Sequence, residues 1–70
     1  MVLTDKQCMI AVSAMLEACD RNVEVIGDES EVEGLAELRD DLADATCAED
    51  PSRLPEFLDR FDAIEWPTEG

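Results

Sequence analysis

Five carboxylates recur at steps of three and four residues in the middle of the chain: Glu33, Glu37, Asp40, Asp41 and Asp44. On a helix, residues at these steps share one face and stand about 5–6 Å apart. Successive phosphates along a nucleic-acid strand are comparably spaced, so such a row can occupy a basic groove that otherwise holds nucleic acid. The spacing therefore predicts a binding surface for a positively charged site. The alternative is an acidic face that only keeps the protein soluble.

The segment Asp20–Glu31 offers a different chemistry, because it resembles an EF-hand calcium loop. Oxygen-bearing side chains stand at positions 1, 3, 5, 9 and 12 of that motif. Position 6 of an EF-hand is glycine because the backbone turns sharply there, whereas this chain has Val25 there and Gly27 two places later. A β-branched residue is sterically disfavoured at positive φ. We therefore predict no metal site, with calcium binding as the lesser alternative.

Several catalytic chemistries lack the residues they need. The chain has no His, no Tyr and a single lysine, Lys6. Histidine-based acid-base pairs, nucleophilic triads and the standard zinc frameworks are therefore unavailable. The three glycines are isolated from one another, so there is no glycine-rich phosphate loop. These absences favour a protein that is not an enzyme and uses no cofactor.

The cysteines, Cys8, Cys19 and Cys47, are odd in number and lack framework spacing. This pattern is typical of a reducing compartment, and we expect a cytoplasmic protein. Cys8 and Cys19 fall on one predicted helix about 16 Å apart, beyond disulfide reach. The spacing leaves a Cys19–Cys47 disulfide open, but we interpret the cysteines as small buried hydrophobic residues with free thiols.

Helices must position these groups. Thr4 and Gln7 have the spacing of a capping box, Asp28 and Ser30 are candidate starts of a second helix, and Pro51 suits the start of a third. Apolar residues recur at helical spacing after each start. We predict an all-α fold, a small antiparallel three-helix bundle with helices over about 5–20, 30–47 and 52–64, forming one domain over residues 1–70. The alternating segment 22–26 is expected to be a short extended piece.

Two large apolar residues are candidate partner contacts. Ile10 lies outside the apolar face of the first predicted helix. We expect this helix to be central and almost fully buried, with an exposed Ile10 patch for dimerisation or partner contact as the alternative. Trp66 is expected to pack on the edge of the core, and the alternative is an exposed anchor.

Charge is the most informative feature of the sequence. Nineteen acidic residues against five basic ones give a net charge of -14, and residues 24–50 alone carry eleven acids and one base. Such a surface repels phosphates and anionic lipids, so direct binding to nucleic acid or a membrane is disfavoured. We predict a non-enzymatic protein that occupies a basic, nucleic-acid-binding site on another protein, as a nucleic-acid mimic or phage-type inhibitor does. A soluble adaptor or homodimer that uses apolar contacts is the alternative.

Overall fold

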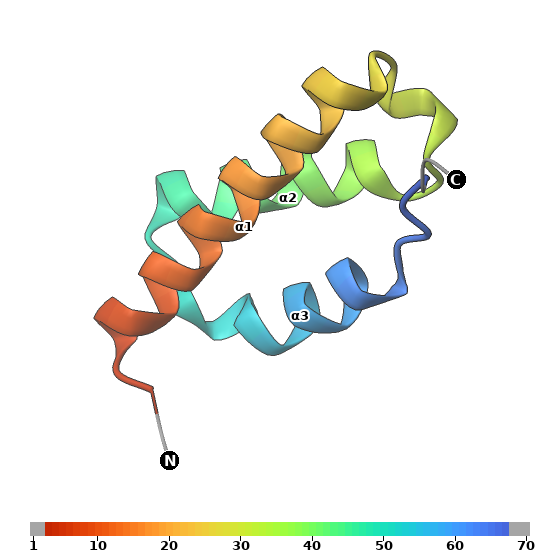
Figure 1. Ribbon diagram of the computed structural model, residues 1–70. Helices are drawn as coiled ribbons and strands as arrows, with labels where there is room; N and C mark the ends of the chain where they lie inside the picture. Colours follow the sequence, from red (N-terminus) through yellow and green to blue (C-terminus); the bar gives the residue numbers. More distant parts are fainter. Residues whose placement is uncertain (1–2, 68–70) are drawn as a thin grey trace.

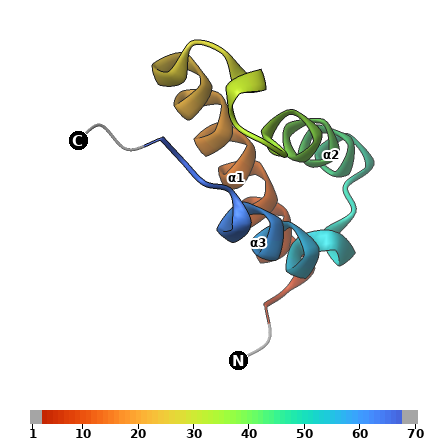
Figure 2. The same ribbon diagram turned by 90° about the vertical axis from the view of Figure 1, so that its right-hand side faces the viewer.

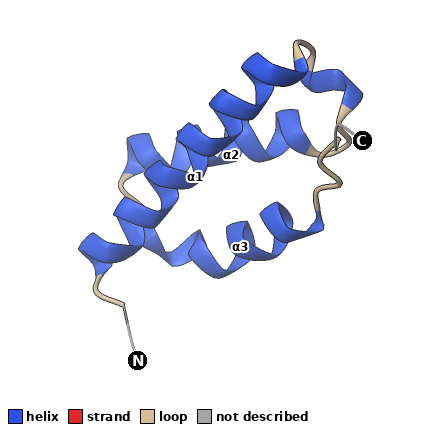
Figure 3. Ribbon diagram, in the orientation of Figure 1, coloured by secondary structure: helices blue, strands red, loops and turns tan. Residues whose placement is uncertain are grey.

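The computed structural model describes residues 3–67, and these form three α-helices and two short 3₁₀ helices without any strand (Figure 3). In chain order they are α1 (Asp5–Ile26), η1 (Glu29–Glu31), α2 (Leu35–Ala48), η2 (Pro51–Arg53) and α3 (Leu54–Ala63). The chain reverses direction between α1 and α2 and again between α2 and α3 (Figure 1). The view along α2 shows α1 inclined to it, with α3 below (Figure 2). The predicted all-α bundle is confirmed.

The first helix begins where its capping box predicts. The Gln7 backbone N–H donates to Thr4 Oγ1 at 3.1 Å, and the Thr4 backbone N–H donates to Gln7 Oε1 at 2.8 Å. The helix continues to Ile26, so the predicted end near residue 20 is wrong. The segment expected to be extended is its last turn, where Val23 and Ile26 pack against the core. Helical packing thus overrides the alternating pattern.

The second helix begins later than predicted, at Leu35 instead of residue 30. Asp28 caps only the short helix η1, where its Oδ1 accepts from the backbone N–H and the hydroxyl of Ser30 at 3.0 and 2.8 Å. Gly34 then adopts a left-handed conformation, φ 84°, at the N-cap of α2. A residue with a side chain is strained in this conformation, so the glycine permits the break that separates η1 from α2.

The third helical segment starts as two pieces. Asp50 caps η2 by accepting from the backbone N–H and hydroxyl of Ser52 at 3.0 and 2.6 Å, and Pro51 occupies the first turn. The chain passes directly from η2 into α3, which ends at Ala63. The predicted span of 52–64 is therefore close to the combined extent of η2 and α3.

A single core lies between the three helices. Its largest fully buried side chains are Phe57, Leu35, Leu38, Leu42 and Val12. The molecule measures only 38 × 25 × 16 Å, so each helix has one side on this core and another facing outward. The fold therefore leaves an outward face on α1 and another on α2.

Candidate functional site

The predicted acidic row lies on and just before α2, and the packing of this helix fixes which carboxylates face outward. Leu35, Leu38, Leu42 and Ala45 are buried in the core. Glu33 lies in the turn before the helix. Four of the five predicted carboxylates are exposed, and the structure shows no ion pair for any of them within residues 3–67: Glu33, Glu37, Asp40 and Asp44.

Asp41, the fifth member of the row, has a different environment. Arg60 of α3 donates to its Oδ2 at 2.6 Å, and an Arg53 guanidinium nitrogen lies 3.6 Å from the same oxygen. The hydrogen bond from Arg60 lowers the pKa of Asp41 below its usual value. Glu56 accepts from the same two arginines, and its pKa is lowered mainly by the bond from Arg53. Asp41 therefore joins α2 to η2 and α3, and it is already neutralised by the protein's own cations.

Another arginine joins α1, η1 and α2. Arg39 donates to Asp20 Oδ1 through Nε at 3.0 Å and through Nη2 at 2.6 Å, and it also pairs with Glu29. Arg39, Arg53 and Arg60 are three of the chain's five basic residues, and each forms an ion pair between helical elements. The cations thus hold the helices together and do not neutralise the outward acidic face.

The acidic row divides into two places on the surface. Asp40, Asp41 and Asp44 line an open hollow of about 410 Å³ together with Cys47. Glu33 lines another hollow with Glu65, which follows α3. Glu65 is not predictable as part of this surface from local spacing, because only the packing of the segment after α3 brings it near Glu33. The α2 acidic face is defined as the exposed carboxylates of this helix that form no ion pair within residues 3–67: Glu37, Asp40 and Asp44.

The two predicted apolar contacts differ in exposure. Ile10 is 60% exposed, so the expectation that α1 is almost fully buried is wrong on this side. Trp66 is half-buried against the core, and its ring centroid lies 5.3 Å from that of Phe61. The expected packing of Trp66 on the core edge is confirmed.

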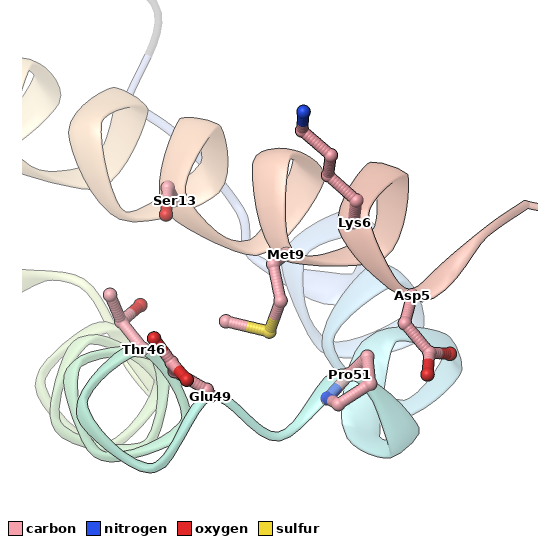
Figure 4. A pocket seen from close by; sticks show the side chains of 7 residues that line it. All are labelled: Asp5, Lys6, Met9, Ser13, Thr46, Glu49 and Pro51. Carbon is pink, nitrogen blue, oxygen red and sulfur yellow. The ribbon is translucent and has the colours of Figure 1, made fainter.

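A further hollow lies between the first turns of α1 and the connection from α2 to η2 (Figure 4). It has a volume of about 480 Å³. Met9 extends into it, whereas Lys6 extends away from it (Figure 4). Its other lining residues are Asp5, Ser13, Thr46, Glu49 and Pro51. Thr46 already donates its hydroxyl to the Leu42 carbonyl at 2.8 Å. The hollow thus shows no activated nucleophile or acid-base pair among its lining residues.

The segment that resembles a calcium loop is mostly helical. Asp20 to Ile26 belong to α1, so the oxygen-bearing residues among them radiate around a helix and do not surround a loop. No group of three His, Cys, Asp or Glu residues within 3–67 is arranged to hold a metal ion. The geometry therefore differs from that of an EF-hand.

The three cysteines carry free thiols in the structure. Cys19 is fully buried, and burial raises the pKa of its thiol. Cys8 is half-buried, which also fits the interpretation as a small hydrophobic residue. Cys47 is exposed beside the α2 acidic face and departs from that interpretation.

None of the helices within residues 3–67 combines the length and apolar character that a membrane crossing requires. Comparisons of the chain with protein-family models, with curated proteins and with solved structures give no match.

Proposed function

We propose that this protein is a non-enzymatic binding protein whose α2 acidic face occupies a basic site on another protein. The observation that carries the proposal is the separation of charges. Arg39, Arg53 and Arg60 pair between helices, while Glu37, Asp40 and Asp44 are exposed without a cationic partner in the described part of the chain. A partner that supplies lysines or arginines would offset this unpaired charge.

A site that normally binds nucleic acid fits this surface best. The carboxylates project from a rigid helix at steps of three and four residues, about 5–6 Å apart, and offer charge without hydrogen-bond donors. A phosphate backbone offers the same features to a protein. Action as a nucleic-acid mimic or phage-type inhibitor is therefore the specific form of the proposal. The missing His and Tyr residues support a binding role over catalysis.

The test compares the wild-type protein with two variants, a test variant and a control, that each lack three negative charges. In the test variant, Glu37→Gln, Asp40→Asn and Asp44→Asn neutralise the α2 acidic face. In the control, Glu24→Gln, Asp59→Asn and Asp62→Asn neutralise three other exposed acids that form no ion pair within residues 3–67. Asp41 stays unchanged in both variants, because its neutralisation would also remove a contact between α2 and α3.

The wild-type protein, immobilised at low salt, should capture a basic protein from the lysate of its native host. The affinity of the captured protein is then measured by titration calorimetry against all three proteins. We expect the test variant to bind at least tenfold more weakly than the control, and binding should weaken with salt and be displaced by nucleic acid. Equal affinity of test and control variants, or failure of nucleic acid to compete, would refute the proposal.

A further inference from the structure

The outer face of α1 differs from the rest of this acidic surface. A hollow of about 470 Å³ follows the helix, and its lining is one continuous strip: Lys6, Met9, Ile10, Ser13, Ala14 and Glu17. The centre of the strip points away from the buried side of α1, and Met9 lies at the edge of the strip, next to the hollow of Figure 4. A single exposed apolar side chain is ordinary on a protein surface. The strip is distinctive because the residues around Ile10 are small or apolar, while Lys6 at one end and Glu17 at the other carry opposite charges.

The strip is complementary to itself when it is reversed. We consider an antiparallel pair of α1 helices in which residue n of one helix lies at the same height as residue 23 − n of the other. Lys6 then faces the partner's Glu17, and Glu17 faces the partner's Lys6. Ile10 faces the partner's Ser13, and Ser13 faces the partner's Ile10. Small side chains thus meet large ones at the centre, while both ends form ion pairs.

Other arrangements lose this complementarity. A parallel pair in register places Lys6 against the partner's Lys6 and Glu17 against the partner's Glu17. An antiparallel pair shifted by one turn in one direction places Ile10 against the partner's Glu17. The nearest shift in the other direction brings the two Ile10 side chains together but leaves Lys6 facing the partner's Ala14. Of these arrangements, only the antiparallel one that places Lys6 opposite the partner's Glu17 pairs the charged ends and also packs large side chains against small ones in the middle.

Charge also identifies the occupant of the strip. Lys6 and Glu17 form no ion pair within residues 3–67, and their opposite charges make the strip neutral. The whole chain carries a net charge of -14, so two copies repel each other over most of their surface. The strip is a place where two copies can approach without bringing like charges together.

We propose that two copies of this chain form a two-fold symmetric homodimer through the α1 strip, in the antiparallel arrangement described above. The inference goes beyond the proposed function, because the dimer uses α1 and leaves the acidic face of α2 available to another protein. The contact follows one helix over about 16 Å, so the buried area is small and the dimer is expected to be weak, in the micromolar range. Its long-range repulsion is screened by salt, so association should strengthen with ionic strength. Binding through the α2 acidic face has the opposite salt dependence, so the two proposals are tested independently.

Sedimentation velocity over micromolar to millimolar protein, at two salt concentrations, provides the test. We expect concentration-dependent dimerisation of the wild type. Lys6→Glu and Glu17→Lys alone each place like charges at both ends of the interface and should weaken the dimer about tenfold or more. The double variant exchanges the two charges and should recover dimerisation to within about threefold of wild type. An equimolar mixture of the two single variants should form a mixed dimer, because both end contacts then join opposite charges.

The apolar middle is tested by Ile10→Asp, which should abolish the dimer. Leu58→Asp is the matched control, since Leu58 is 53% exposed on α3 and should tolerate the change without loss of dimerisation. The proposal is refuted if the wild type stays monomeric at millimolar concentration. It is also refuted if the charge-exchanged double variant stays as weak as the single variants, or if Leu58→Asp disrupts the dimer as strongly as Ile10→Asp. Circular dichroism verifies that each variant is folded, and the charge variants decide the question even if Ile10→Asp unfolds the protein.

Discussion

The outer faces of α1 and α2 are built on the same core but have opposite character. The middle of α1 exposes Ile10 between Lys6 and Glu17, so its charge is balanced. The outer side of α2 exposes Glu37, Asp40 and Asp44 with no compensating cation within residues 3–67. Most of the basic residues lie between helices, and their placement determines which face stays acidic. A net charge of -14 is therefore a property of the whole chain that says little about any one surface.

The largest expected change in the free energy of unfolding comes from the core, and it tests whether residues on the outward faces can be substituted without loss of stability. Leu38 is fully buried and Glu37, its neighbour on α2, is exposed. Leu38→Ala should lower the free energy of unfolding by about 2–5 kcal/mol, because it leaves a cavity. Glu37→Gln should change it by less than about 0.5 kcal/mol. Urea unfolding of the two variants measures both values, and similar losses would show that the outer face of α2 is part of the stabilising structure.

A gain in stability is expected at the end of α2, away from Asp40 and Asp44. Glu49 adopts a left-handed conformation with φ 52°, and it is the only residue other than glycine with positive φ within residues 3–67. Glu49→Gly should raise the free energy of unfolding by about 1 kcal/mol, because glycine adopts this conformation without steric cost. Thermal unfolding measures the gain. Glu49→Ala serves as the control and should give no such increase, because alanine keeps the Cβ atom.

Two adjacent aspartates on α2 should respond differently to neutralisation. Asp41 accepts a hydrogen bond from Arg60, whereas Asp40 is exposed and forms no ion pair within the described residues. We expect Asp41→Asn to lower the free energy of unfolding at pH 7 and Asp40→Asn to leave it unchanged or raise it. Because the folded pKa of Asp41 lies below the unfolded value of 3.8, its stabilisation is complete above that value and disappears as the pH falls through the folded pKa.

The difference between wild type and Asp41→Asn should therefore be present at pH 7 and shrink as the pH falls below 3.8. Chemical unfolding at a series of pH values measures this difference. A difference that does not shrink at all as the solution is acidified below this value would mean that the carboxylate charge of Asp41 is not what stabilises the contact with α3.

The smallest effect compares the two faces directly. Asp40→Asn with Asp44→Asn removes two like charges four residues apart, while Glu17→Gln with Glu24→Gln removes the same net charge from α1. We expect the first pair to raise stability by about 0.5 kcal/mol more than the second at low salt, because like charges at this spacing destabilise a helix. The difference should disappear in high salt, as measured by melting temperature. A difference that persists in 1 M salt would contradict its electrostatic origin.

The parts of the fold that were predictable depend on nearby residues. The capping box of Thr4 and Gln7 satisfies its hydrogen bonds within three residues, so the sequence alone reveals the start of α1. The start of α2 was misplaced because Asp28 and Ser30 do form a cap, but for a short 3₁₀ helix. The left-handed conformation at Gly34 that separates it from α2 has no positive signature in the sequence, since glycine is also tolerated inside helices.

The candidate site was predictable only as a set of charges. Helical spacing places the acidic residues near one side of α2, but it does not show which of Asp40 and Asp41 forms an ion pair. The position of α3 decides between them, because Arg60, nineteen residues beyond Asp41 in the chain, pairs with Asp41 and not with Asp40. The exposure of Ile10 depends in the same way on the absence of a fourth helix over α1 in the described part of the chain. Such outcomes are set by tertiary packing and cannot be inferred from local spacing.

The packing of Trp66 gives the protein a built-in optical reporter. Trp66 is the only tryptophan, and the chain has no tyrosine, so near-ultraviolet fluorescence arises almost entirely from one indole ring. That ring lies against Phe61 and lines a small hollow with Asn22, Val25 and Ile26 at the end of α1. Its emission therefore senses whether the segment after α3 stays attached to the first helix, while circular dichroism follows the helices themselves. The two events can therefore be timed separately without any added label.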